Sequence, residues 1–266
     1  MTIRRQKMKS KVNWAAAILI ATVLSNAVFA IQTVRLNTGY NHALSVDAPY
    51  SPTTQDNYWI RIGSGFPALS PAVAPAWAIN RPAGSVWLPP FPNSTWINAA
   101  NSSASLAGVN QNNPGYQVYR KCFCLQKGFN KANMRFQVRA DDSVAIFFNN
   151  YGNQILPTSA GNWGSGNPYF VNVDQGFKVG RNCIYVLVGD VGSYAGFNLE
   201  GTVSANGLLP TPSFGISGNQ NQGTFEPCGC ESGPAGLMKN SEENDSEIAE
   251  KILESARKGK IKEILR

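Results

Sequence analysis

Two adjacent acidic residues, Asp141 and Asp142, are the side chains in this sequence best suited to holding a cation. Carboxylate and amide oxygens are the ligands that calcium prefers, and two amides, Asn149 and Asn150, follow a short distance along the chain. We therefore take Asp141 and Asp142 as candidate metal ligands, with Asn149 or Asn150 as a further ligand in the coordination shell. The alternative is a turn in which both carboxylates accept hydrogen bonds from nearby backbone amides.

A polar segment around Trp163 offers a second kind of chemistry. Trp163 follows Asn162 in a stretch rich in glycine, serine and asparagine. An indole ring can stack on the C–H face of a sugar, while an asparagine amide both donates to and accepts from hydroxyl groups. The sequence thus predicts carbohydrate contact through Trp163 and Asn162, with Asn149 and Asn150 as further ligand-binding candidates. Alternatively, Trp163 folds back onto its own domain.

The five cysteines form two Cys-x-Cys pairs, Cys122/Cys124 and Cys228/Cys230, plus Cys183. Residues two apart on a strand face the same side, and export favours disulfides. We expect Cys228 and Cys230 to tether the tail to the strand that carries Cys122 and Cys124, which leaves Cys183 over. Alternatively, Cys183 pairs and a tail cysteine bonds another chain, or the four paired cysteines bind zinc or copper.

No motif predicts catalysis. His42 is the only histidine, and neither a nucleophile elbow nor a phosphate-cradling glycine loop accompanies it. The formal charge of +7 falls to +2 once the five basic residues near the N-terminus are set aside, so the charge predicts no nucleic-acid partner. We expect a non-enzyme with no cofactor other than the calcium considered above.

The first thirty residues read as an export signal. Basic residues from Arg4 to Lys11 precede an apolar run, Trp14 to Leu24, and Ala27 and Ala30 form a small-x-x-small cleavage site. We expect a signal peptide over 1–30 and a secreted or cell-surface protein, periplasmic if the source has an outer membrane. The alternative is an uncleaved anchor helix.

Residues 31–207 are poor in charge and rich in turn-forming and aromatic residues, which predicts a single all-β domain. Period-two alternation on both sides of Asp141-Asp142 predicts a hairpin over 132–150. The proline-rich stretch from Gly63 to Pro92 predicts a surface crossover and not a central strand. Arg120 and Lys121 are expected at solvated strand ends. The expected strands are 32–36, 58–62, 116–125, 133–140, 144–148, 183–189 and 197–203.

The tail differs in composition from this domain. Residues 208–240 are rich in Gly, Pro and Asn and predict an irregular linker that contains the Cys228/Cys230 pair. Apolar residues at helical spacing then predict an amphipathic helix over 241–266, with its N-cap at Asn244-Asp245. This helix could dock on the main domain, pair with another chain or remain partly solvated.

Short motifs occur in a fixed order in six segments, 56–59, 94–97, 115–125, 141–142, 176–184 and 196–201. This ordered set resembles a family of exported bacterial galactose-binding-like domains. The resemblance implies a jelly-roll β-sandwich that is frequently carbohydrate-binding or adhesive and seldom catalytic. The acidic pair is also similar to the paired-aspartate calcium loop of yeast flocculin-type lectins, in which calcium holds sugar hydroxyls, although Ser143 stands where those lectins usually have glycine.

These observations lead to one main hypothesis and two alternatives. The main hypothesis is an exported, non-catalytic jelly-roll protein that binds carbohydrate or another extracellular polymer through loops at one end of the sandwich. The first alternative is a structural component of the cell surface or matrix that self-associates through its tail. The weaker second alternative is an enzyme that acts on glycans.

Overall fold

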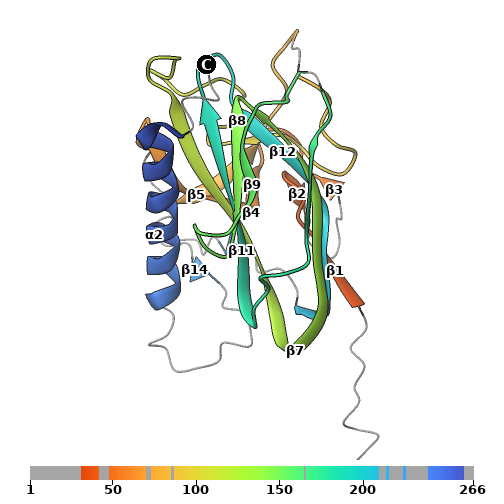
Figure 1. Ribbon diagram of the computed structural model, residues 1–266. Coiled ribbons are helices and arrows are strands. Elements are labelled where there is room, and N and C mark those ends of the chain that lie inside the picture. Colours follow the sequence, from red (N-terminus) through yellow and green to blue (C-terminus); the bar gives the residue numbers. More distant parts are fainter. Residues whose placement is uncertain are drawn as a thin grey trace, which may run out of the picture. The chain divides into compact units, whose positions relative to one another are not determined.

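The computed structural model describes residues 31–41, 48–69, 73–84, 87–164, 166–209, 214–215, 224–225 and 239–260. The predictions for the export signal, for His42 and for the pairing of Cys228 and Cys230 lie outside these residues. Most of the described chain is β-strand, followed by a C-terminal helix, so the predicted all-β, jelly-roll-like class is confirmed (Figure 1). None of the helices in the described ranges is long and apolar enough to span a membrane.

The strands form two layers. The first layer holds, in spatial order, β5 (Ala74–Ala78), β4 (Gln55–Phe66), the first half of β7 (Gly115–Asp141), β11 (Gly180–Asp190), β8 (Ser143–Phe148) and β9 (Gln154–Ala160). The second layer holds β1 (Ile31–Arg35), β12 (Gly196–Leu209), the second half of β7 and β10 (Tyr169–Val173). β6 (Ile97–Asn98) pairs with both β5 and β12 and so joins the layers. The short strands β2 (Tyr40–Asn41) and β3 (Ala48–Pro49) pair with each other, as do β13 (Phe214–Gly215) and β14 (Thr224–Phe225).

Strand β7 passes from one layer to the other. Its residues 115–125 pair with β11, and its residues 130–141 pair with β12. Gly128, between these two halves, and Lys131, near the start of the second half, have positive φ angles of 84° and 53°. The sequence predicts two separate strands here, and both exist as the two halves of this long strand.

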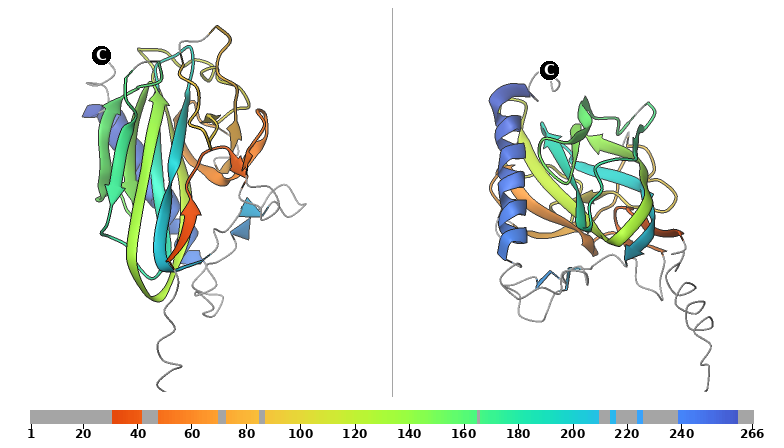
Figure 2. Two further views of the ribbon diagram at one scale, coloured as in Figure 1. Left: turned by 90° about the vertical axis from the view of Figure 1, so that its right-hand side faces the viewer. Right: turned by 60° about the horizontal axis from the view of Figure 1, so that its bottom comes forward.

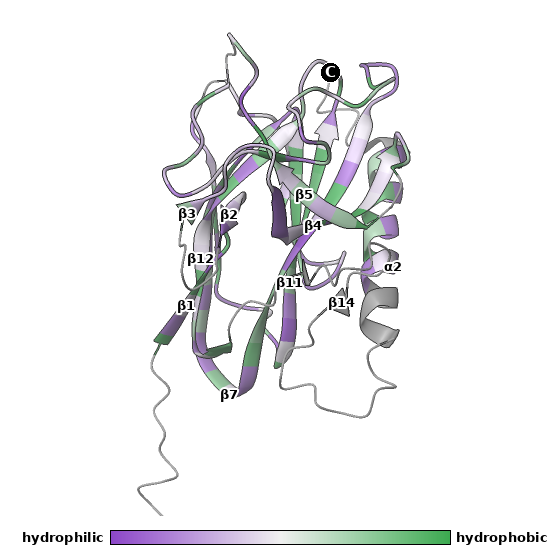
Figure 3. Ribbon diagram, turned by 180° about the vertical axis from the view of Figure 1, so that it is seen from behind, coloured by the Kyte–Doolittle hydropathy of each residue, from purple (hydrophilic) through white to green (hydrophobic). Residues whose placement is uncertain are grey.

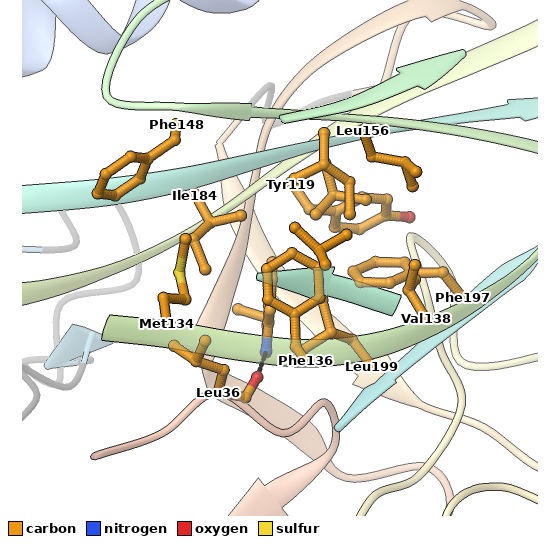
Figure 4. Close-up of a cluster of buried hydrophobic side chains, with 14 of the residues drawn as sticks. Leu36, Tyr119, Met134, Phe136, Val138, Phe148, Leu156, Ile184, Phe197 and Leu199 are labelled. Carbon is orange, nitrogen blue, oxygen red and sulfur yellow. Dashed lines mark hydrogen bonds between the residues drawn. The ribbon is translucent and has the colours of Figure 1, made fainter. Parts of the chain in front are cut away.

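The core lies between the layers and follows directly from the alternation in the sequence. Tyr119 and Phe123 of β7 point inward and meet Met134 of the same strand's second half and Phe197 of β12. Figure 4 shows part of this cluster, and the ribbon of β7 in Figure 3 alternates between hydrophilic and hydrophobic residues. Burying each such large side chain stabilises the fold by roughly 1.5–3 kcal/mol.

The C-terminal helix covers the outer face of the first layer. It comprises α2 (Lys239–Ser255) and a π-helical turn η1 (Ala256–Lys260). Ile248, Ile252 and Leu253 pack on a second apolar cluster formed by outward-facing residues such as Ile60 and Leu187. Figure 2 shows α2 beside the layer that holds β4 and away from β12. Of the three possibilities that the sequence leaves open for this helix, docking on its own domain is therefore the one observed.

The predicted N-cap at Asn244-Asp245 is wrong, because α2 begins earlier, at Lys239. Asp245 lies inside the helix and is buried against the sheet. Its carboxylate accepts hydrogen bonds from Arg120, from Arg181 (2.9 Å) and from the hydroxyl of Tyr185 (2.6 Å). An aspartate before an apolar run is typical of an N-cap, but here the same residue is the ionic anchor of the helix.

The predicted hairpin over 132–150 is also wrong. The second half of β7 pairs with β12 and β10, whereas β8 pairs with β11 and β9. Asp141 and Asp142 therefore link the two layers instead of turning the chain within one sheet. The period-two pattern is the same in both cases, because each flanking strand has one face in the core.

Two further expectations about the first layer are wrong. The proline-rich stretch is not only a crossover, since it supplies β5, which lies between β4 and β6. Pro75 lies in β5 beside a register shift in β4, where the missing amide hydrogen of a proline is tolerated.

Arg120 and Lys121 are 3% and 1% exposed, so they are buried and not at solvated strand ends. Arg120 points outward to the helix, and Lys121 approaches the Asn37 carbonyl at 3.4 Å.

The disulfides correct the expected cysteine pairing. Cys122 bonds Cys183, its direct partner in the register of β7 and β11, so Cys183 is not left over and Cys122 does not tether the tail. Cys124 is also disulfide-bonded. Because both cysteines of this strand are oxidised, the alternative of a four-thiolate metal site is wrong as well. The sequence could not identify Cys183 as the partner, because it does not reveal which strands are neighbours.

We expect non-reducing peptide mapping to join the Cys124 peptide to the peptide that contains Cys228 and Cys230, since these are the two remaining cysteines of the five. A link over about 100 residues would stabilise the fold by roughly 4 kcal/mol in the chain-entropy description. The Cys122–Cys183 peptide is the internal control. Recovery of Cys124 as a free thiol, or only in a dimer, would contradict this prediction.

Candidate functional site

The acidic pair, Asp141 and Asp142, lies at one end of the sandwich, where four segments meet. Asp141 is the last residue of β7, and Asp142 leads directly into β8. Ser143 of β8 pairs with Gly189 near the end of β11 and with Ala160 at the end of β9. The segments that follow β9 and β11 therefore begin beside the acidic pair.

Asp141 is buried, at 4% exposure, and only one of its two carboxyl oxygens has a hydrogen-bond donor among the described residues. Its Oδ2 accepts a hydrogen bond from the indole Nε1 of Trp87 at 2.8 Å, whereas its Oδ1 has no hydrogen-bond donor among the described residues. Burial, and then the adjacent carboxyl group of Asp142, raise the pKa of Asp141 to about 9. Two carboxyl groups this close need either a shared proton or a cation, because two bare carboxylates repel each other.

Backbone amides and a third acid hold Asp142 in place. Asp142 Oδ2 accepts a hydrogen bond from the Val191 amide at 2.7 Å, and the Asp142 amide donates to the Gly189 carbonyl at 2.7 Å. Asp190 lies next to this contact and is also buried. Burial raises the pKa of Asp190 to about 6, although hydrogen bonds from Gly192 and Ser105 oppose the shift. The site therefore brings together three carboxyl groups, those of Asp141, Asp142 and Asp190.

Aromatic side chains form a wall beside the acidic pair. Trp87 and Trp96 are buried with ring centroids 4.3 Å apart, and the half-buried Trp163 packs against this group. Tyr194 lies edge-on to Trp87 at 6.4 Å and is 41% exposed. Trp163 does fold partly onto the domain, as the alternative interpretation proposed, and it is half-buried, so part of the residue stays accessible to solvent.

Asn162 positions the loop that carries Trp163. Its Oδ1 accepts from the Ala140 amide at 3.1 Å, and its Nδ2 donates to the carbonyls of Val138 and Asn167 at 3.3 and 3.1 Å. These bonds use both amide hydrogens and leave the group buried at 8% exposure. Asn162 thus supports the site next to Trp163, and its side chain has no donor left for a sugar.

The structure separates Asn149 and Asn150 from the acidic pair. The six residues of β8 stand between them, which corresponds to roughly 20 Å at about 3.3 Å per residue. Asn149 instead holds a turn, because its amide bonds the Cys183 amide, the Gly176 carbonyl and the Asn182 side chain. Neither asparagine can complete a cation shell with Asp141 and Asp142, so that part of the sequence interpretation is corrected.

A calcium ion fits this site only as an open one. Within the described ranges, no group of three or more His, Cys, Asp or Glu side chains is arranged to hold a metal. The acidic pair supplies carboxylate oxygens, including the unpartnered Oδ1 of Asp141, but calcium takes six to eight oxygen ligands. Backbone carbonyls, water or hydroxyl groups of a bound molecule would have to supply the others.

Sequence reasoning missed Trp87 and Asp190 as parts of this site. Trp87 lies 54 residues before Asp141 in the proline-rich stretch, and its spacing carries no signal. Asp190 follows the predicted strand 183–189 and joins the site through the pairing of β11 with β8. An acid at the end of a predicted strand is a weak signal, which becomes informative only once the neighbouring strands are known.

The sequence matches no known family profile and no curated protein. Among solved structures it is similar to the PA14 domain of the MpAFP antifreeze protein, with 19% identity over 43% of this chain and 48% of that chain and a TM-score of 0.22. It is also similar to a family 35 carbohydrate-binding module from an environmental isolate, with 19% identity over 46% and 80% of the two chains and a TM-score of 0.27. A family 35 module from Clostridium thermocellum gives 14% identity, 43% and 79% coverage and a TM-score of 0.24. At these values none of the three assigns a function to this chain.

Proposed function

We propose that this protein is an exported, non-catalytic carbohydrate-binding protein, and that the acidic pair holds a calcium ion through which a sugar binds. The observation that carries the proposal is the buried, unpartnered Oδ1 of Asp141 beside the carboxyl group of Asp142. A cation there would satisfy an oxygen that no described residue satisfies. It would also relieve the repulsion between two adjacent carboxylates.

The surroundings of the acidic pair favour a sugar as the molecule that completes the shell. The two carboxylates leave several calcium positions open, and vicinal hydroxyl groups are hard oxygen ligands of the kind that calcium accepts. Trp163 and Tyr194 provide aromatic surface at the same end of the sandwich, on which the C–H face of a sugar ring can stack. Hydroxyl coordination and stacking together would fix the orientation of one ring.

The cysteine chemistry supports export. Cys122 and Cys183 are joined in the described structure, and such bonds persist in oxidising compartments. The N-terminal signal expected from the sequence agrees with this location. Assembly through the tail receives less support, because the apolar residues of α2 are already buried against the sandwich of the same chain.

A binding screen on immobilised glycans, run with calcium and with chelator, tests the proposal. We expect saturable binding in calcium, little binding in chelator, and loss of binding in Trp163→Ala but retention in Trp163→Phe, which keeps an aromatic face. Binding that is equal with and without calcium would refute the role of the ion. No binding of any glycan in calcium would refute the function.

The acidic pair also predicts how stability depends on pH without calcium. The pKa of Asp141 is higher in the folded chain than in the unfolded chain, so the folded state holds the proton more tightly. The stability that the tightly held proton on Asp141 contributes is fully present below about pH 4, and it is lost as the pH rises toward 9. Thermal melts in chelator should therefore show a falling Tm over this range. Asp141→Asn, a neutral isostere, should flatten the fall, while the exposed Asp174→Asn should leave it unchanged; an unflattened curve in Asp141→Asn would contradict the assignment.

A further inference from the structure

The outer face of the second layer carries an aromatic side chain, Phe170, that is not packed in the core. Phe170 of β10 is 74% exposed, more than any other large hydrophobic side chain described, while Val171 beside it faces the core. A single exposed apolar residue is common on protein surfaces and needs no explanation. Phe170, however, lines a groove of about 440 Å³ on this face.

The strand register places polar side chains in rows next to Phe170. Phe170 pairs with Gln137 of β7, which in turn pairs with Glu200 of β12. The next outward row along the strands contains Asn172 and Arg135. Strands lie about 4.8 Å apart, so the two rows form a platform with the phenyl ring at one edge.

Part of the hydrogen-bonding capacity on this platform is unused within the described structure. Both oxygens of Glu200 already accept, from Asn93 and from Gln137. Arg135 uses only its Nε, which donates to Asn172 Oδ1 at 2.9 Å, and its two terminal nitrogens have no described partner. The amide oxygen of Gln137 likewise has none. The groove therefore offers a guanidinium fork and an amide oxygen beside an exposed ring.

This combination selects one class of ligand. A phenyl ring stacks on the C–H face of a pyranose, and a guanidinium fork pairs with a carboxylate through two parallel hydrogen bonds. The only acid that lines the groove, Glu200, has both oxygens engaged by amide donors, so the guanidinium group of Arg135 is the charged group there that keeps free hydrogen-bonding capacity. A sugar that carries a carboxylate matches both the ring and the guanidinium fork.

We propose that this face is a second binding site, for an acidic polysaccharide of uronate units, with one ring on Phe170 and its carboxylate on Arg135. The ligand class rests on the proposed carbohydrate-binding function, but the site uses neither the acidic pair nor calcium. An extended chain could follow the groove across β10, β7 and β12. The protein would then have two sites with different ionic requirements.

The test is a titration of the full-length mature protein with oligogalacturonate, in chelator throughout so that the acidic pair cannot hold calcium. We expect binding that falls at least tenfold in Phe170→Ala and in Arg135→Gln, since stacking and a charged hydrogen-bonded pair each contribute a factor of this order. Lys127→Gln, which removes an exposed charge outside the groove, should bind like the parent protein.

Three outcomes would overturn the second site. These are no binding of oligogalacturonate, equal binding by the Phe170→Ala and Arg135→Gln variants, or equal binding of cellohexaose, which has no carboxylate. All are distinguishable from failure of the proposed function, which is measured in calcium and through the acidic pair. Because Phe170 and Arg135 are exposed, both variants are expected to fold, and their thermal melts verify it.

Discussion

Replacing Asp245 with asparagine is expected to destabilise the protein by about 3–5 kcal/mol, or roughly 6–20 °C in Tm for a chain of this size. Asp245 joins α2 to the sheet through Arg120, Arg181 and Tyr185. The side chains of Asp245 and Arg120 are both 4% exposed. An amide keeps the shape but leaves two guanidinium groups without their counter-charge, and an uncompensated buried charge is costly.

Glu247→Gln is the matched control for this prediction. Glu247 lies on the same helix and pairs with Lys251, but both side chains are more than half exposed. Solvent screens such pairs, so the expected loss of stability is small beside that of Asp245→Asn. Chemical or thermal unfolding of the two variants gives the comparison. Equal, small losses would mean that the buried ion cluster does not anchor the helix.

Replacing Asp142 with asparagine is expected to weaken calcium-dependent glycan binding at least ~100-fold. Loss of groups that merely orient a metal ligand already costs 10–100-fold, and Asp142 is proposed as one of two carboxylate ligands. The variant should fold normally, because an amide oxygen can still accept the hydrogen bond from Val191. Titration of the parent and variant with the glycan found in the screen, at fixed calcium, measures the effect.

Asp174→Asn controls for the loss of one negative charge, because Asp174 is exposed and lies away from the acidic pair. Its glycan affinity should equal that of the parent. If Asp142→Asn also bound like the parent, Asp142 would not be a ligand. The carboxylate would then serve only to hold the segment after β11 through Val191.

The sequence predicts local structure well where the signal is itself local. Alternation identifies the strands around Tyr119, Val144 and Phe197, because each places every second residue in the core. It also puts Cys122 and Cys124 on one face of their strand. It cannot show that Asp141-Asp142 joins two layers, since a hairpin and an interlayer link bury the same alternate residues.

Only part of the candidate site could be predicted from the sequence, for a related reason. The acidic pair and Trp163 stand out by residue type and by the composition of their segments. Asn149 and Asn150 are near Asp142 in sequence, but a straight strand carries them away from it. Trp87 and Asp190 are distant in sequence, and the pairing of β11 with β8 and the burial of Trp87 bring them close.

A calorimetric titration of calcium into the mature protein most directly tests the central claim that the acidic pair holds a cation. We predict one calcium ion per chain for the parent protein and for Asp174→Asn, and no measurable binding for the Asp141→Asn, Asp142→Asn double variant. Failure of the parent protein to bind at millimolar calcium, or unchanged binding by the double variant, would contradict the account.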